Sequence, residues 1–212
     1  IAEDAVIGSS VLSVSASDVD AGDSLSYGIT AGNTGGVFAI DSIGNITTVS
    51  ALDFETAAQY VLTVTVTDSG SLTDAATVTI DVTNVNENPV ANDNSGSIAE
   101  DAVIGSSVLS VSASDVDAGD SLNYGITAGN TGGAFAIDSS GNITTATALD
   151  FETTAQYVLT VTVTDSGSLT DAATVTIDVT NVNENPVAND NSGSIAEDAV
   201  IGSSVLSVSA SD

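Results

Sequence analysis

Residues 60–67 read Tyr-Val-Leu-Thr-Val-Thr-Val-Thr, which places β-branched side chains on both faces of an extended segment. Branching at Cβ and a two-residue period are typical of a β-strand. Residues 76–83, Ala-Thr-Val-Thr-Ile-Asp-Val-Thr, have the same pattern, and the Asp68-Ser-Gly-Ser turn lies between the two segments. The sequence therefore predicts two long strands of matching pattern separated by a turn.

The two strands belong to a unit that recurs along the chain with a period of 97 residues, because Ile1-Ala-Glu-Asp returns at Ile98 and Ile195. A period of this length is too long for a solenoid and fits one small domain per copy. We expect repeat 1 at residues 1–88, repeat 2 at 89–185 and a partial repeat 3, with the first strands only, at 186–212. Near-identity of the copies suggests a segment of a longer array. The first two copies differ at six positions, Ser26/Asn123, Val37/Ala134, Ile43/Ser140, Val49/Ala146, Ser50/Thr147 and Ala57/Thr154.

Shorter alternating segments complete each copy. Turn-forming clusters of Gly, Asn, Asp and Ser separate them, and no helical period is found. About seven short strands in each copy predict an all-β fold of tandem seven-stranded Greek-key β-sandwiches with an immunoglobulin-like architecture. In the first copy these strands are expected at residues 11–16, 25–29, 38–40 and 45–48, and an edge strand is expected around Ile98 in the second.

The composition describes a folded polyanion. The chain has 212 residues with 29 acidic side chains and no Lys, Arg or His, which gives a formal charge of -29. Hydrophobic residues nevertheless make up 42% of it, so a disordered acidic tail is excluded. Such a chain needs cations to offset its self-repulsion, whereas nucleic acid is a poor partner. Cysteine is absent, so there is no disulfide framework, and no apolar run approaches the ~20 residues of a membrane-spanning helix.

Many of the acidic residues gather at the predicted strand ends and in loops. Carboxylate and amide oxygens are hard ligands, of which Ca²⁺ takes about six to eight. An i, i+2 spacing places two such oxygens on one side of an extended segment. The sequence therefore predicts metal binding by side chains at the following places in the first copy: Glu3, Asp18-Val-Asp20, Asp53-Phe-Glu55, Asp68 and Asn84-Val-Asn-Glu-Asn-Pro89.

This ordered set resembles the cadherin repeat, of the kind found in bacterial giant adhesins of the RTX type. Cadherin units carry a Glu in the first strand, a DxD motif, an LDRE motif, an Asp after a YxLxVxAxD strand, and a DxNDNxP linker. The counterparts here follow the same order over the whole repeat. The resemblance implies a seven-stranded sandwich, a Ca²⁺ cofactor and as many as three ions at each junction between repeats.

The resemblance also implies which residues hold the ions. The first junction would take Asp115, Asp117 and Asp165 from repeat 2, and the next would take Asp212 from the partial repeat. Asp18, Asp20 and Asp68 are the counterparts in repeat 1. The remaining ligands implied are Glu3, Asp53, Glu55, Asn86, Glu87 and Asn88 for the first junction, and Glu100, Asp150, Glu152, Asn183, Glu184 and Asn185 for the next.

Three positions depart from the family pattern. Asn84 replaces the first linker Asp, Glu87 replaces the second, and Phe54 stands where the family has Arg. Asn84 keeps a carbonyl oxygen but loses one charge, so Ca²⁺ affinity should fall. The number of ions at each junction is therefore left open.

The same residues are also compatible with structural roles that involve no metal. Asp18 and Asp20 alone are equally compatible with a turn, and the Asp53/Glu55 pair with a loop cap. The Tyr and Phe residues fit a hydrophobic core better than a sugar-binding platform. Since the chain has neither a His nor a Cys nucleophile and no aromatic-walled cleft for a carboxylate pair, we expect no enzyme.

The sequence thus favours a Ca²⁺-rigidified extracellular extender or adhesin, secreted or at the cell surface. The alternatives are a self-assembling subunit of an extracellular filament, matrix or surface layer, formed by strand exchange or lateral association, and a carbohydrate-binding module. The expected partners are other copies of the repeat in the same or neighbouring chains, and surface or matrix ligands. No nucleic-acid partner and no membrane insertion are expected of this segment.

Overall fold

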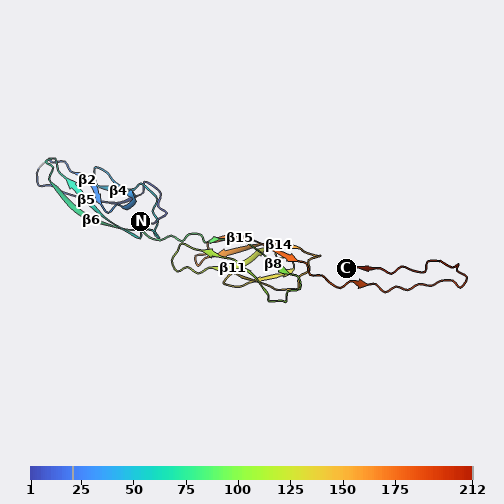
Figure 1. The fold of residues 1–212 in the computed structure, drawn as a ribbon. Coiled ribbons are helices and arrows are strands. Elements are labelled where there is room, and N and C mark those ends of the chain that lie inside the picture. The colour runs from blue at the N-terminus through green and yellow to red at the C-terminus, as the bar shows by residue number, and fades with distance from the viewer. Residues whose placement is uncertain (21, 212) are drawn as a thin grey trace. The chain divides into compact units, whose positions relative to one another are not determined.

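The computed structural model describes residues 1–20 and 22–211, which form two compact units (Figure 1). Unit 1 contains residues 1–90, 113–123 and 163–171, and unit 2 contains residues 91–112, 124–162 and 172–211. Unit 1 thus combines repeat 1 with two segments of repeat 2. The repeat boundaries predicted from the sequence remain a proposal.

Repeat 1 folds into two sheets of three strands each. One sheet has the order β2 (Ser26–Ala31), β5 (Gln59–Thr67) and β6 (Thr73–Asp81), with both neighbouring pairs antiparallel. The other has the order β1 (Ser10–Ser13), β4 (Asn45–Thr48) and β3 (Phe38–Ile40). A single 3₁₀ turn, η1 (Thr34–Gly36), precedes β3.

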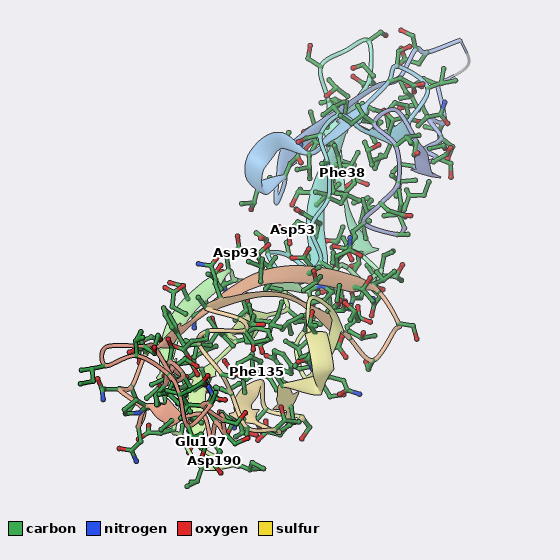
Figure 2. All side chains as sticks on the ribbon, turned by 90° about the vertical axis from the view of Figure 1, so that its right-hand side faces the viewer. Phe38, Asp53, Asp93, Phe135, Asp190 and Glu197 are labelled. Carbon is green, nitrogen blue, oxygen red and sulfur yellow. The ribbon has the colours of Figure 1, made fainter. Side chains whose placement is uncertain are left out.

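The alternation of β5 explains how the two sheets pack. Leu62 and Val64 are fully buried, while Val61 between the strand's inward positions is 50% exposed. Inward side chains of the other sheet, Phe38 and Ile46, complete the same core. Phe38 meets Tyr60 edge-on, with ring centroids 5.1 Å apart, and Figure 2 labels Phe38 in this unit. Alternating burial of this kind is what a two-residue period dictates.

Repeat 2 forms the same two sheets with one additional strand. The first has the order β11 (Asn123–Ala128), β14 (Gln156–Thr164), β15 (Thr170–Thr180) and β8 (Asn94–Ala99). The second has the order β12 (Phe135–Ile137), β13 (Asn142–Thr145) and β9 (Ser107–Ser110). A 3₁₀ turn, η2 (Thr131–Gly133), precedes β12, and the short strands β7 (Val90–Ala91) and β10 (Ala113–Ser114) pair.

The core of unit 2 repeats that of unit 1. Phe135 packs edge-on against Tyr157 at 5.1 Å, and Figure 2 labels Phe135 in this unit. Ile143, Leu159 and Ile177 are fully buried around it. The eight Tyr and Phe residues of the chain all belong to one of the two cores or pack against it. The sequence-based preference for a core role is therefore confirmed, and no described aromatic ring forms a sugar-binding platform.

The C-terminal residues form a separate hairpin, drawn in red in Figure 1, in which β16 (Val187–Ala188) pairs with β17 (Ala210–Ser211). Its side chains are exposed. Neither of the helical turns among the described residues has the length or apolar character needed to cross a membrane.

The prediction of an all-β chain of tandem sandwiches is confirmed. The two longest predicted segments became β5 and β6, and the predicted strands at residues 38–40 and 45–48 have the bounds of β3 and β4. The segment predicted at 11–16 is shorter in the structure, because only Ser10–Ser13 pairs with β4.

Candidate metal centre

Glu3 is the most buried residue of the first acidic cluster, with only 9% of its surface exposed. Its Oε2 accepts a hydrogen bond from the backbone N–H of Phe54 at 2.7 Å. Its Oε1 accepts one from the N–H of Val85, also at 2.7 Å. A single carboxylate therefore holds the turn after Leu52 and the segment after β6 in one place. A neutral side chain could not accept two such bonds with the same strength.

Two further glutamates converge on Glu3. One carboxylate oxygen from each of Glu3, Glu55 and Glu87 lies within 4.8 Å of the others. Burial raises the pKa of Glu87 above its usual value, and the nearby charges of Glu3 and Asp117 raise it further. The pKa of Glu55 is raised for the same reasons, burial first. With no basic side chain in the sequence, these carboxylates have no cationic partner within the protein.

The cluster lines an open cavity of about 360 Å³ in unit 1. Glu3, Glu55 and Glu87 form its acidic wall, together with Asp4 and Asp53. Leu52 and Val116 supply apolar surface. The cavity therefore presents several carboxylates to one small volume.

Asparagine amides join this cluster to aspartates of the segments 113–123 and 163–171, which belong to the same unit. Asn84 donates from Nδ2 to Oδ1 of Asp117 at 2.6 Å, and the backbone N–H of Glu87 donates to the other oxygen at 2.9 Å. Asn86 donates from Nδ2 to Oδ2 of Asp165 at 2.7 Å. Three positions of the Asn-rich segment thus hold two aspartates of the predicted ligand set.

A second close set consists of Asp115, Asp120 and Asp165, with one oxygen from each within 4.8 Å of the others. Asp165 is only 6% exposed. The Oδ2 atoms of Asp115 and Asp120 and the Oε2 of Glu87 are buried without a hydrogen-bond partner. A buried carboxylate oxygen without a hydrogen-bond partner is costly, so these three atoms fit a site that binds a cation.

Asp120 belongs to this close set, although neither it nor its counterpart Asp23 was among the ligands predicted from the sequence. Its Oδ1 accepts hydrogen bonds from the backbone N–H groups of Ser121, at 3.0 Å, and Ser166, at 3.2 Å. The Ser166 hydroxyl also donates to Asp120 and is the main reason that the pKa of Asp120 is lowered. A signal was available: the acid follows the DxD motif after one Ala-Gly pair in both full copies.

The equivalent acids of repeat 1, Asp18, Asp23 and Asp68, also form a close set, but they are more exposed. Asp18 accepts a hydrogen bond from the N–H of Asp20 at 2.9 Å, as a turn residue does. Asp115 makes the same turn with Asp117 at 3.0 Å and is half-buried. The difference follows from the Asn-rich segment, which covers Asp117 and Asp165 but has no counterpart beside Asp20 and Asp68 in the described residues.

Unit 2 contains a matching glutamate cluster of Glu100, Glu152 and Glu184. Glu100 is 8% exposed and accepts hydrogen bonds from the N–H groups of Phe151, at 2.8 Å, and Val182, at 2.6 Å. These two bonds lower the pKa of Glu100, whereas burial and the Glu100 charge raise that of Glu184.

Several predicted ligands lie outside these close sets. Both carboxylate oxygens of Asp53 are used within its own turn, accepting from the N–H of Thr56 at 2.7 Å and its hydroxyl at 2.9 Å. Asp150 makes the same turn with Thr153. The loop-cap interpretation therefore accounts for these bonds. Of the other predicted ligands, Asn88, Asn183 and Asn185 are exposed, and Asp212 lies outside the described residues.

The donors in both units suit a hard divalent cation. The close sets consist of carboxylate oxygens, and three of the carboxylate oxygens are buried without partners. Calcium prefers such ligands and tolerates irregular coordination, whereas zinc and copper favour His and Cys, which this chain lacks.

Comparison with known proteins agrees with this geometry. The Cadherin domain model matches residues 1–83 and 94–180. Protocadherin Fat 1 of Homo sapiens is 40% identical over 177 residues, covering 78% of this chain, and the protocadherin-like wing polarity protein stan of Drosophila melanogaster is 42% identical over 231 aligned positions, covering all of it. This chain spans only 4% and 6% of those two proteins.

Solved cadherin structures have the same fold. Cadherin-23 EC22-24 of mouse superposes with a TM-score of 0.76 at 27% identity, covering 99% of this chain and 72% of that one. The extracellular cadherin domains 3-6 of protocadherin gamma B2 give 0.77 at 28% identity, covering 100% and 53%.

The named relatives correct one expectation. They are animal protocadherins, whereas the sequence resemblance pointed to bacterial giant adhesins, and that part of the prediction is not supported. The family itself is shown, because its domain model matches most of this chain. The chain belongs to the cadherin domain family, whose repeats are extracellular, non-enzymatic and bind Ca²⁺.

Proposed function

We propose that the acidic clusters of this chain hold Ca²⁺ and that the bound ions convert the array into a stiff extracellular extender for adhesion. The observation that carries the proposal is the group of buried, unpartnered carboxylate oxygens on Glu87, Asp115 and Asp120. In a chain with no basic side chain, a bound cation is the available way to offset them.

The ligands proposed for the first cluster come from both close sets of unit 1. Glu3, Glu55 and Glu87 would hold one part of the ion cluster, and Asp115, Asp117 and Asp165 the other. Asn86 contributes by its amide oxygen, once the amide turns that oxygen toward the metal. Glu100, Glu152 and Glu184 would serve the corresponding cluster of unit 2, to which Asp212 is predicted to add one carboxylate.

Calcium would supply electrostatic cross-linking. Without it, the carboxylates of Glu55, Glu87 and Asp117 repel one another. With it, each ion bridges carboxylates from separate segments and fixes the segment between them. Rigidity then becomes a function of the free Ca²⁺ concentration.

The adhesive role rests on the family. The relatives named above are protocadherins and cadherins, and adhesion through other copies of the repeat is the proposed role of this chain. The target remains a protein or matrix surface presented outside the cell.

Small-angle scattering of the 212-residue chain tests the mechanical proposal. We expect a larger and better-defined maximum dimension in millimolar Ca²⁺ than in a chelator, because bridged carboxylates stiffen the array. Magnesium at equal ionic strength separates specific binding from screening, since screening alone acts equally for both ions. The same maximum dimension in chelator and in Ca²⁺ would reject the extender mechanism.

A further inference from the structure

The turn between β14 and β15 has a glycine at a position where the backbone does not require one. Residues 165–169 read Asp-Ser-Gly-Ser-Leu. Ser168 adopts a left-handed φ of 74°, a conformation that favours glycine, whereas Gly167 beside it lies outside the left-handed region. The same arrangement recurs in repeat 1, where Ser71 has a φ of 71° and follows Gly70. Backbone conformation therefore does not explain the glycine at residue 167.

Asp165 holds this turn closed and is itself buried, with 6% of its surface exposed. Its Oδ1 accepts a hydrogen bond from the N–H of Leu169 at 2.8 Å, and its own N–H donates to the carbonyl of Leu169 at 3.1 Å. Its Oδ2 accepts from Nδ2 of Asn86 at 2.7 Å. One carboxylate oxygen thus fixes the turn, while the other holds the segment 84–88, which belongs to the same unit.

The side chain of Asn86 occupies the space that a side chain at residue 167 would need. A Cβ atom built on Gly167 would lie 2.5 Å from Cγ of Asn86 and 2.7 Å from its Nδ2, and still closer to its Oδ1. Non-bonded carbon atoms pack best at about 3.5–4.0 Å, so a residue with a Cβ atom would displace the Asn86 amide. The close approach of this amide therefore explains the glycine.

The amide of Asn86 is linked to the neighbouring contacts of its segment. Its Nδ2 also donates to the carbonyl of Glu87 at 3.2 Å. The N–H of Glu87 donates to Asp117 at 2.9 Å, and Asn84 donates to the other oxygen of the same carboxylate. Displacing the amide from the turn would therefore break its bond to Asp165 and disturb the contacts with Asp117.

We propose that Gly167 is a positioning residue of the metal centre. Because it leaves space for the Asn86 amide, the segment 84–88 can dock on the turn 165–169 and hold Asp165 before an ion binds. This docking needs no metal, whereas its effect on Ca²⁺ affinity rests on the proposed function. Replacing a residue that orients metal ligands typically weakens metal binding by about 10–100-fold.

Gly167→Ala tests the proposal, and Gly70→Ala is its matched control. A Cβ atom at Gly70 would meet only the side chain of Asp68, at 3.4 Å or more, which is an ordinary contact. In chelator, nuclear magnetic resonance follows the side-chain amide signals of Asn86, which are identified by their loss in Asn86→Ala. These signals should shift and exchange faster with solvent in Gly167→Ala, and should be unchanged in Gly70→Ala.

Calorimetric titration measures the effect on metal binding. Gly167→Ala should bind Ca²⁺ at least about tenfold more weakly than the native chain, whereas Gly70→Ala should bind it equally well. Because the clash acts through Asn86, Gly167→Ala should cause no further loss in a chain that already carries Asn86→Ala. Circular dichroism follows folding, and if Gly167→Ala alone unfolds the chain, the double variant should fold again because the clash is gone.

Unchanged Asn86 signals and unchanged Ca²⁺ affinity in Gly167→Ala overturn the proposal. So does an equal effect of Gly70→Ala, a tenfold loss caused by Gly167→Ala in the Asn86→Ala background, or a double variant as unfolded as Gly167→Ala. If the native chain binds no Ca²⁺ but Gly167→Ala still releases the Asn86 amide in chelator, the proposed function is lost and the docking inferred here is retained.

Discussion

The side-chain nitrogen of Asn86 lies 2.7 Å from Oδ2 of Asp165, although 79 positions separate the two residues. Both predicted ligands are therefore held together before any ion is considered. In this arrangement the amide donates to the carboxylate, so it neutralises part of the cost of burying Asp165. When a cation takes over that role, the amide is free to present its oxygen instead.

Calcium affinity should decrease as the pH is lowered, beginning at pH values above the usual pKa of a glutamate. Burial and neighbouring charges raise the pKa values of Glu87 and Glu55 above 4.5. Protons therefore compete with Ca²⁺ as the pH falls toward these raised values. Calorimetric titrations at several pH values between about 7 and about 5 measure the effect. A constant affinity over this window would contradict the assignment of these glutamates as ligands.

In the absence of Ca²⁺, the free energy of unfolding should increase as the pH is lowered, whereas the Ca²⁺ affinity decreases. A carboxyl group whose folded-state pKa is raised binds more protons in the folded than in the unfolded state. The free energy of unfolding contributed by Glu87 and Glu55 therefore rises as the pH falls through their raised pKa values. Thermal unfolding in chelator, followed from about pH 7 down to just above pH 4.5, should show that Glu87→Gln loses the Glu87 part of this rise while the Glu55 part remains.

Asn84→Asp should strengthen Ca²⁺ binding and weaken the apo form. The substitution adds a carboxylate beside Asp117 and removes the amide that donates to it at 2.6 Å. Without metal, the lost bond and the new repulsion should cost about 1–3 kcal/mol. Asn84→Ala is the control, because it removes the donor without adding charge. Denaturant unfolding and calorimetry follow the two effects, and unchanged Ca²⁺ affinity in Asn84→Asp would argue against a metal beside this position.

Glu3→Ala should lower both stability and Ca²⁺ affinity. Glu3 accepts hydrogen bonds from the N–H groups of Phe54 and Val85, which would be left unpaired. We expect a loss of about 2 kcal/mol or more in the free energy of unfolding in chelator, since bonds to a charged group are the stronger kind. Glu3→Gln keeps one acceptor oxygen and should be intermediate. If Glu3→Ala weakens Ca²⁺ binding while leaving apo stability intact, the organising role of Glu3 is wrong.

Substitutions in the hydrophobic core should change the free energy of unfolding by the same amount with and without Ca²⁺. Leu62 is fully buried between the two sheets, so Leu62→Ala should cost about 2–5 kcal/mol in the free energy of unfolding. Val61→Ala, at a neighbouring position that is 50% exposed, should change it by about 0.5 kcal/mol or less. Denaturant unfolding with and without Ca²⁺ compares the two, and a loss for Leu62→Ala that vanishes in Ca²⁺ would contradict a metal-independent core.

The strands could be predicted from the sequence because their patterning is local. Alternating Val and Thr in residues 60–67 specify both an extended backbone and an inward face, and β5 has these features. The parallel pairing of β8 with β15 joins residues about 80 positions apart, and no local pattern indicates it.

The sequence predicted part of the grouping of the acidic side chains, whereas their role as Ca²⁺ ligands stays a prediction. Family motifs brought Glu3, Glu55 and Glu87 together correctly as neighbours. Asp53 looked equivalent to Glu55 by spacing, yet Thr56 supplies two nearby donors that turn its carboxylate into a local cap. Asp120 lies outside the DxD motif and reaches Asp115 and Asp165 only because the turn folds back on itself.

Calorimetric Ca²⁺ titration of the 212-residue chain and of its Asp115→Asn, Asp165→Asn variant tests the central claim most directly. The account predicts that the variant loses part of the saturable Ca²⁺ binding. Asp74→Asn, at an exposed aspartate outside the clusters, should bind as the native chain does. Identical binding isotherms for the native chain and the double variant, or an equal loss in the control, would contradict the claim that these carboxylates hold Ca²⁺.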